Sequence, residues 1–580
     1  MLTALTLLAY LPALRAGFVW DDDQYVTGNA ALRSLGGLLA IWLEPGAVPQ
    51  YYPLTFTSLW LDFHAWGVEP AGYHAVNLLL HALNAVLLWR VLAALRLSGA
   101  WAAAAVWALH PVQVESVAWV AERKNVLSGA FYLSALLAYL RFADAAQRQR
   151  WRWYALSAAL FAAALLGKTV TCSLPAALCL VLWWRNGSLR AADLVPLLPF
   201  FALGGALAGV TVWMERHHVG AGGADWQLSL LERCLIACRA LWFYAGSLVW
   251  PANLTFIYPR WRVDPTVWWQ YLYPGAALAG LALLVARRAR GGRGPLVCVL
   301  LFAGTLVPAL GFFDVFPMRY TFVADHYQYL ASSALIVLAV TAAAEWCRRR
   351  GARAVRAGRI ALAAILLVLG GLTWRQAATY ADAETLWRDT LAKNPSAWMA
   401  HNNLGLLLFE RGRIGEAFGH YVMALSLKPD DDFAFNNRGN AFAARGNMAQ
   451  AEQDFLAALA IAPHNAEARN NLGNVLAHGE RWTEAAEQYR AALSVKPRYA
   501  DAHNNLANVL AISGDTDGAL AHYREAVRLD PTYAEARYNL AVLLAGRGDS
   551  AAAVVELREA LRLRPNYPEA RATLENLLRP

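Results

Sequence analysis

The stretch WMAHNNLGLLLFERGRIGEAFGHYVMALSLKP, residues 398–429, decides the fold of the C-terminal part of the chain. It holds two apolar helical segments and ends in a proline. Prolines stand 34 residues apart throughout this region, at 395, 429, 463, 497, 531 and 565. The other marker positions of the stretch are Leu404, Gly405, Ala417, Tyr421 and Ala424. A fixed period of this length predicts a stack of helix pairs.

This period is that of the tetratricopeptide repeat, and five full repeats are expected over about 398–567. A lone helix at about 381–393 and a last helix at 568–580 would cap the stack, because each repeat buries its apolar face only against a neighbour. The sequence therefore predicts an all-α chain in two parts. A polytopic membrane helical domain occupies 1–374, and a repeat α-solenoid occupies 375–580.

The first part is too apolar for an ordinary water-soluble domain. Of the 580 residues, 58% are hydrophobic and 16% are charged, against roughly 45–50% and about 25% in soluble domains. Apolar windows that approach the ~20 residues needed to cross a bilayer occur at 2–15, 73–95, 100–118, 125–142, 153–167, 171–184, 194–213, 271–286, 295–312, 328–345 and 360–373. We expect about 11–12 transmembrane helices, with 2–15 retained as the first because it lacks a basic leader.

Three basic clusters predict the orientation of these helices. They are Arg148, Arg150 and Arg152; Arg287, Arg288, Arg290 and Arg293; and Arg348, Arg349, Arg350, Arg353, Arg356 and Arg359. Cytoplasmic loops favour such clusters, so the N-terminus is expected in the cytoplasm and the repeats outside it, in a bacterial periplasm. The clusters account for the net charge of +9, so no nucleic acid is expected as a partner. The segment 232–250 breaks the alternation if it spans, and we expect it to be interfacial or re-entrant.

The motif FVWDDDQYVTGN, residues 18–29, follows the first predicted helix and places three carboxylates side by side just outside the membrane. Adjacent like charges repel, so a mere helix boundary does not require them. One interpretation is a solvated acidic cap on a short helix. The other is a general base or a metal ligand at the mouth of a membrane cavity.

Further polar groups stand at the ends of other apolar windows. They are His110, Glu115, Glu122, Arg123, Lys124, Asn125, Lys168, Arg319, Asp325 and His326. Any one of them could be a snorkelling or paired structural residue. Together, several cations around a carboxylate cluster favour the binding of an anionic lipid head group such as a phosphate.

These motifs resemble the transmembrane and tetratricopeptide-repeat O-mannosyltransferase-like family. The matching stretches are FVWDDDQYVTGN, YYPLTFTSLWLDFHAWGVEPAGYHAVNLLLHALN (51–84), HPVQVESVAWVAERKNVLSGAFYLSALLAYLRF (110–142), WPANLTFIYP (250–259) and ADHYQYL (324–330), followed by the repeats. The family belongs to the C-type glycosyltransferase superfamily of integral membrane enzymes, which take a sugar from a polyprenyl-phosphate donor. Their shared acidic pair in the first outer loop matches Asp21 and Asp22.

The resemblance implies roles for individual residues. Asp21, paired with Asp22, would accept the proton of a Ser or Thr hydroxyl as it attacks the anomeric carbon. The residues expected to orient the acceptor or the sugar are Asp23, His110 and Glu115. Those expected to bind the donor phosphate are Arg123, Lys124, Lys168, Arg319 and His326, although relatives usually carry arginine at the last position. No metal or other cofactor is expected to be required, although three aspartates could hold a divalent ion.

Asparagines recur with the period of the repeats, at Asn403, Asn437, Asn471, Asn505 and Asn539. Asparagine is a poor helix former, so the series needs a reason. It either links adjacent repeats by hydrogen bonds or lines a groove for the backbone of an extended peptide. The latter resembles the asparagine ladder of the nuclear and cytoplasmic O-linked N-acetylglucosamine transferase.

The sequence therefore favours a membrane glycosyltransferase that transfers a mannose-like sugar from a polyprenyl-phosphate donor to Ser or Thr hydroxyls of proteins held by the repeats. The alternatives are a lipid-linked oligosaccharide ligase or polymerase, and a non-catalytic scaffold that recruits proteins. No strand-turn-helix glycine loop for a nucleotide sugar is visible.

Overall fold

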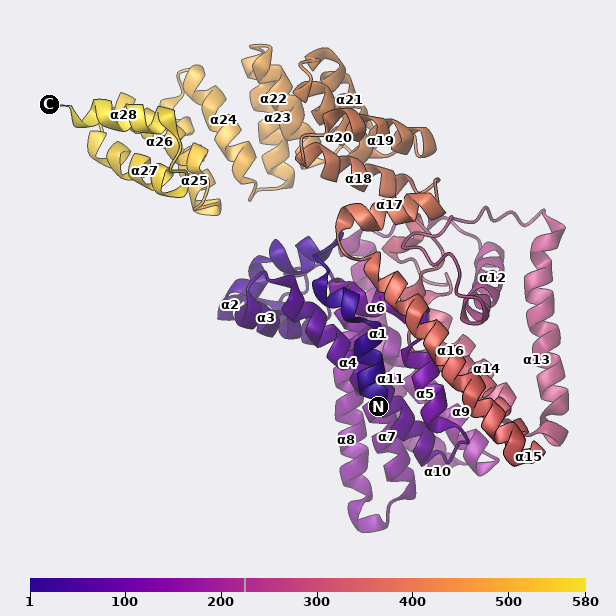
Figure 1. Ribbon diagram of the computed structural model, residues 1–580. Coiled ribbons are helices and arrows are strands. Elements are labelled where there is room, and N and C mark those ends of the chain that lie inside the picture. Colours follow the sequence, from indigo (N-terminus) through magenta and orange to yellow (C-terminus); the bar gives the residue numbers. More distant parts are fainter. Residues whose placement is uncertain (224–225, 580) are drawn as a thin grey trace. The chain divides into compact units, whose positions relative to one another are not determined.

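The computed structural model describes residues 1–223 and 226–579, apart from the side chains of residues 147, 148 and 290. Two of the predicted cytoplasmic arginines, Arg148 and Arg290, thus have side chains outside the described part. Every regular element in the described ranges is a helix, which confirms the predicted all-α class (Figure 1). The chain divides into two compact units, Met1–Ala397 and Trp398–Pro580.

The first unit contains seventeen α-helices in the described residues. They are α1 (Leu2–Ala9), α2 (Leu35–Leu43), α3 (Pro53–Trp66), α4 (Pro70–Ala94), α5 (Ala100–Ala108), α6 (Val114–Ala118), α7 (Arg123–Asp144), α8 (Gln147–Gly167), α9 (Leu174–Asn186), α10 (Ala191–Leu194), α11 (Leu198–Met214), α12 (Leu230–Val249), α13 (Leu272–Gly291), α14 (Gly294–Leu306), α15 (Ser332–Arg350), α16 (Ala352–Ala378) and α17 (Ala383–Lys393). Short 3₁₀ and π turns join several of them, among them η2 (Asp23–Thr27), η5 (Val120–Glu122), η6 (Thr169–Ser173), η12 (Phe316–Arg319) and η13 (Asp325–Gln328).

Five helical stretches of the described residues are long and apolar enough to cross a membrane. They are Pro70–Ala94, Val120–Asp144, Ala191–Val219, Trp268–Ala289 and Ala352–Ala378, and each overlaps one predicted window. The other six windows do not form such a helix in the described ranges. In the first of them α1 ends after eight residues. In the window 100–118 the helix stops at Ala108, shortly before Pro111, which has no N–H to continue it.

The broken backbone after α5 is held by one polar face of α4. Asn77, His81 and Asn84 are spaced for a single helix face, and all are fully buried. Asn77 Nδ2 donates to the carbonyls of Val117 (3.3 Å) and Trp119 (3.2 Å). These bonds satisfy carbonyls that no longer have helical partners, and so fix the segment that carries Trp119 and Glu122.

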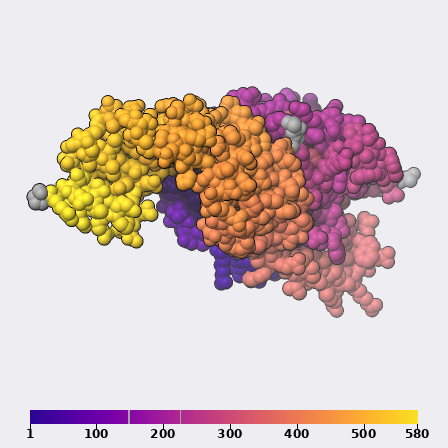
Figure 2. All heavy atoms as spheres, turned by 90° about the horizontal axis from the view of Figure 1, so that it is seen from above, coloured from indigo at the N-terminus to yellow at the C-terminus, as the bar shows by residue number. Residues whose placement is uncertain are grey.

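The second unit is the expected stack of helix pairs, and it is continuous from the orange to the yellow part of Figure 2. Its helices are α18 (Trp398–Glu410), α19 (Ile414–Leu427), α20 (Asp432–Ala444), α21 (Met448–Ile461), α22 (Ala466–His478), α23 (Trp482–Val495), α24 (Ala500–Ile512), α25 (Thr516–Leu529), α26 (Ala534–Gly546), α27 (Ser550–Leu563) and α28 (Pro568–Leu578). A Cβ at Gly473 would lie 2.5 Å from the ring of Tyr489, so glycine allows the two helices of this repeat to approach closely.

Candidate active site

Asp22 ties two segments of the site together. Its side chain is fully buried, with Oδ2 accepting a hydrogen bond from the backbone N–H of Val19 (2.9 Å) and Oδ1 one from that of Ala121 (2.7 Å). Burial raises the pKa of Asp22 well above its usual range. Because backbone donors occupy both oxygens, Asp22 joins the backbone near Val19 to that near Ala121.

Asp21 is half-buried and has one oxygen available. Its Oδ1 accepts a hydrogen bond from the indole N–H of Trp119 (3.1 Å), whereas Oδ2 has no hydrogen-bond partner within the described residues. Burial raises the pKa of Asp21 to about 7, because the loss of solvation outweighs the attraction of Lys124. A carboxylate with a pKa near neutrality is suited to act as a general base.

Glu122 is the centre of the cationic part of the site. It is 1% exposed, and its two oxygens lie 3.0 Å from Nζ of Lys124 and 3.1 Å from Nζ of Lys168. Lys124 also donates to the hydroxyl of Tyr25 (3.3 Å) and lies over the ring of Trp119 at 5.7 Å. Burial lowers the pKa of Lys168 to about 8. The structure thus brings the two predicted lysines together on Glu122, and Lys124 also interacts electrostatically with Asp21.

His326 joins this cluster from the loop before α15. Its Nδ1 lies 3.1 Å from Oε1 of Glu115, and its Nε2 lies 3.9 Å from Oε1 of Glu122. Its backbone N–H donates to the second oxygen of Glu115 (2.9 Å). Glu115 is therefore engaged by His326 on both oxygens, and acts on the site through that histidine.

Arg123 does not face this cluster, contrary to the expectation that it binds the donor phosphate. Its side chain is fully buried on the opposite side. The guanidinium donates to Asn77, to Ser58 (2.6 Å), to Asp62 (2.7 Å) and to the backbone oxygen of Tyr73 (2.9 Å). All three nitrogens of the group are thus occupied, and the residue holds α3, α4 and α7 together.

The remaining predicted residues lie around the cluster. His110 bonds the backbone oxygen of Leu248 at 3.1 Å, which is a packing contact and does not bring its ring to Asp21. Asp23 is exposed, and its Oδ1 accepts from the N–H of Gln24 (2.7 Å). Arg319 ends η12 and is followed by Tyr320, whose ring packs against Trp20. No group of three His, Cys, Asp or Glu side chains in the described residues is arranged to hold a metal ion.

Sequence reasoning placed Glu122 among the polar groups but assigned it no role, and it missed Trp119 and Tyr25 entirely. The sequence of α4 does carry a signal for such a network. Polar residues recur there every three or four positions within an apolar window, and buried polar groups in a membrane helix must have partners. Such a stripe indicates a buried polar network.

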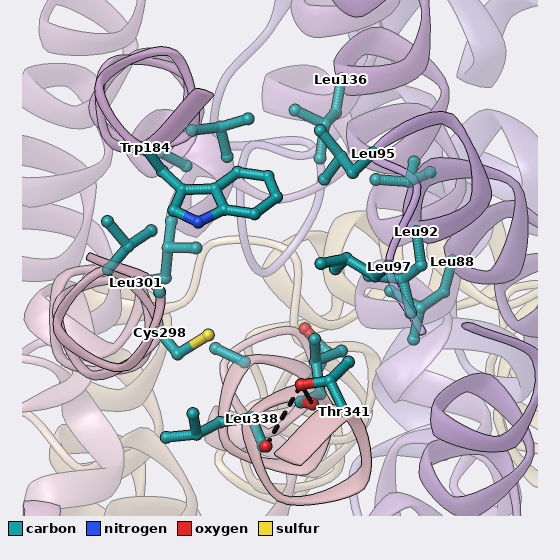
Figure 3. A pocket seen from close by; sticks show the side chains of 18 of the residues that line it. Leu88, Leu92, Leu95, Leu97, Leu136, Trp184, Cys298, Leu301, Leu338 and Thr341 are labelled. Carbon is teal, nitrogen blue, oxygen red and sulfur yellow. Dashed lines mark hydrogen bonds between the residues drawn. The ribbon is translucent and has the colours of Figure 1, made fainter. Parts of the chain in front are cut away.

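An apolar cavity of about 430 Å³ lies within the same unit (Figure 3). Its lining residues come from α4, α7, α9, α14 and α15, and Figure 3 shows Trp184 and Leu301 on one side and Leu88 and Leu92 on the other. Leu330 also lines it, four residues after His326.

The repeat asparagines form hydrogen bonds between adjacent repeats. Nδ2 of Asn437, Asn471, Asn505 and Asn539 donates to Oδ1 of Asn402, Asn436, Asn470 and Asn504, at 3.0 to 3.1 Å. Asn403 differs, because its buried Nδ2 has no hydrogen-bond partner in the part of the chain that the structure describes. The ladder thus links the repeats in register, as the first interpretation expected.

Comparisons with known proteins agree with both halves of this description. Family models described as TPR repeat match residues 476–512 and 507–548, and models described as tetratricopeptide repeat match 374–432 and 534–567. Protein O-mannosyl-transferase Tmtc1 of Drosophila melanogaster is 36% identical over 193 residues, which are 31% of this chain and 22% of the relative. The resemblance to these O-mannosyl-transferases is confirmed.

Other relatives carry the same name. Protein O-mannosyl-transferase TMTC3 of Homo sapiens is 30% identical over 27% of this chain and 18% of its own length. Protein O-mannosyl-transferase F38B6.6 of Caenorhabditis elegans is 22% identical over 74% of this chain and 62% of its own length. The chain thus spans about a fifth of the length of Tmtc1 and of TMTC3.

Solved structures similar to the chain include two repeat proteins. YrrB, described as a TPR protein with an unusual peptide-binding site, is 23% identical, covers 33% of this chain and all of its own, and has a TM-score of 0.27. TTC0263, a thermophilic TPR protein of Thermus thermophilus, is 24% identical, covers 31% of this chain and 99% of its own, and has a TM-score of 0.29.

Proposed function

We propose that the chain is a membrane glycosyltransferase that moves a mannose-like sugar from a polyprenyl-phosphate carrier to Ser or Thr hydroxyls of proteins. The observation that carries this proposal is the half-buried Asp21, with a pKa of about 7, near the buried Lys124, which shares Glu122 with the partly exposed Lys168. The names of the relatives support the same reaction class.

In the proposed reaction, the hydroxyl oxygen attacks the anomeric carbon from the face opposite the phosphate, so that the configuration inverts. Asp21 Oδ2 accepts the hydroxyl proton as the new carbon–oxygen bond forms. The bond between the anomeric carbon and the phosphate oxygen breaks, and its electron pair leaves with the lipid phosphate. The atoms, electrons and charges of this step balance without an oxidant, a reductant or a metal ion.

The two lysines would stabilise the leaving phosphate. Lys124 and Lys168 share Glu122 as a partner at 3.0 and 3.1 Å, and each ammonium has three N–H donors. Each can therefore bind a phosphate oxygen without giving up Glu122. A cation in this buried position acts most strongly on the negative charge that develops on the leaving group.

The apolar cavity lined by Leu88, Leu301 and Leu330 would hold part of the prenyl chain. The repeats would hold the protein acceptor outside the cytoplasm, in the periplasm of a bacterial cell if the basic clusters orient the helices as expected. Deletion of α18 to α28 should then weaken transfer to proteins far more than binding of the donor lipid.

The test is sugar transfer by purified protein in nanodiscs, with a panel of radiolabelled polyprenyl-phosphate sugars and a protein extract. Asp21→Asn should abolish transfer while size-exclusion and melting behaviour stay unchanged. Asp23→Asn is the matched control, because Asp23 is exposed one position away from the predicted pair, and it should keep most of the activity. Full activity of Asp21→Asn would exclude Asp21 as the base, and no consumption of any donor by the unaltered protein would favour the scaffold alternative.

A further inference from the structure

An aromatic cluster lies directly behind Asp21. Trp20 stacks on Trp119 with ring centroids 5.4 Å apart and meets the edge of Phe256 at 5.3 Å. Trp387, from α17, packs against both Trp20 (6.3 Å) and Phe256 (5.5 Å). Trp119, Phe256 and Trp387 are all less than 5% exposed, so the cluster is a packed wall and not a ligand pocket. The indole N–H of Trp119 joins this wall to Asp21.

The backbone that presents Asp21 is strained and needs this wall. The N–H of Asp22 bonds the carbonyl of Val19 (3.1 Å), which closes a turn with Trp20 and Asp21 at its centre. Trp20 has φ of +47°, in the left-handed region that a bulky residue rarely occupies. Such a conformation costs about 1–3 kcal/mol and persists only where the surroundings enforce it. The rings that surround Trp20 therefore determine where Asp21 points.

α17 is attached to both segments that build the wall. The N–H of Gly17 donates to the carbonyl of Ala381 (2.9 Å), just before α17 begins. At the other end of the helix, Nζ of Lys393 donates to the carbonyl of Leu254 (2.7 Å) and Nδ2 of Asn394 to that of Ile257 (3.0 Å). These last two bonds flank Phe256. The helix expected to cap the repeats is thus built into the first unit.

We infer that Trp387 is a positioning residue for the reaction: α17 clamps Trp20 and Phe256, and through Trp119 it holds Asp21 in the orientation that accepts a proton. This inference rests on the proposed function for its effect on turnover. It makes the beginning of the repeat region part of the transferase machinery, whereas the repeats from α18 onward serve acceptor binding.

The test compares full-length variants with a short Ser/Thr peptide as acceptor. Trp387→Ala should lower kcat roughly 10- to 100-fold with little change in KM, because a displacement of about 1 Å at the reacting groups has an effect of that size. Trp387→Phe should restore kcat to within about threefold, since a ring remains against Trp20. Trp482→Ala, which removes a partly buried indole packed against the repeat core, is the control and should leave kcat unchanged even where the KM for the acceptor rises.

A second readout does not depend on activity. Hydrogen exchange should speed up in peptides covering 17–25 and 254–259 in Trp387→Ala and in Lys393→Met, and stay unchanged in 500–512. Unchanged exchange in 17–25, or a Trp387→Ala variant with the original kcat, would overturn the inference. If the unaltered protein transfers no sugar, the proposed function fails, and the exchange data alone then decide whether the clamp exists.

Discussion

The charged groups of the site predict a bell-shaped dependence of kcat/KM on pH. Asp21 acts as a base only when deprotonated, so activity should rise with pH through its pKa of about 7. Lys168 binds phosphate only when protonated, so activity should fall as pH rises through its pKa of about 8. At pH 5 only about 1% of Asp21 is deprotonated, and at pH 10 only about 1% of Lys168 is protonated. The maximum should therefore lie near pH 7.5, with a roughly tenfold loss per unit on either side beyond the two pKa values.

Two substitutions assign the limbs of this profile. Lys168→Arg should remove the alkaline limb, because guanidinium does not titrate in this range. Trp119→Phe removes the N–H that stabilises the Asp21 carboxylate, so the acid limb should move upward by roughly 0.7 pH unit for a hydrogen bond of about 1 kcal/mol. The measurement is initial-rate transfer to a peptide between pH 5 and 10 at constant ionic strength. A profile that is flat between pH 6 and 8, or an alkaline limb that persists in Lys168→Arg, would refute this assignment.

Four further substitutions separate structural from functional charges and amides. Arg123→Met should destabilise the protein by about 3–5 kcal/mol in thermal or denaturant unfolding, because it leaves the buried carboxylate of Asp62 without its partner. A variant that folds normally and shows only a raised KM for the donor would show instead that this arginine binds phosphate. Asn505→Ala should lower the unfolding free energy of the repeats by about 1–2 kcal/mol, since three hydrogen bonds are lost. Asn403→Ala, which removes an amide nitrogen with no partner in the described residues, should cost measurably less, and equal losses would contradict the register role of the ladder. Glu122→Gln should leave Lys168 without its counter-charge and so lower the pKa of that lysine further. The alkaline limb of the pH profile should then shift to lower pH. An alkaline limb at the original pH would show that the carboxylate does not set the charge of the lysine.

The repeat unit could be predicted closely because its signal is local and recurs. A lone helix was expected at about 381–393, and α17 runs from Ala383 to Lys393. What the period could not reveal is that α17 packs on Trp20, which lies near the other end of the first unit's sequence. Contacts of that separation follow from the tertiary fold of the whole unit, and no pattern within either segment encodes them.

The site was predicted in part, for a reason that adjacent residues illustrate. Arg123 and Lys124 begin the same helix, and successive side chains on a helix point about 100° apart. Only one of the two can face Asp21, and composition alone does not say which. The choice depends on the break near Pro111 and on Asn77, which fix where the helix starts. Sequence therefore predicted the residue types of the candidate site, whereas the separation of Lys124, which contacts Glu122, from Arg123, which is bound by α3 and α4, required the fold.

The arrangement of charges explains how the buried Lys124 and the partly exposed Lys168 are tolerated without a bound anion. An unpaired buried cation is costly, and Glu122 compensates both with contacts that use one donor of each. A polyprenyl-phosphate sugar carries one negative charge, and its phosphate gains a second as the bond to the sugar breaks. The attraction of the lysines for the phosphate grows as this second charge develops, because it scales with the charge on the phosphate. Their stabilisation is therefore concentrated on the transition state, which is the condition under which binding energy raises kcat.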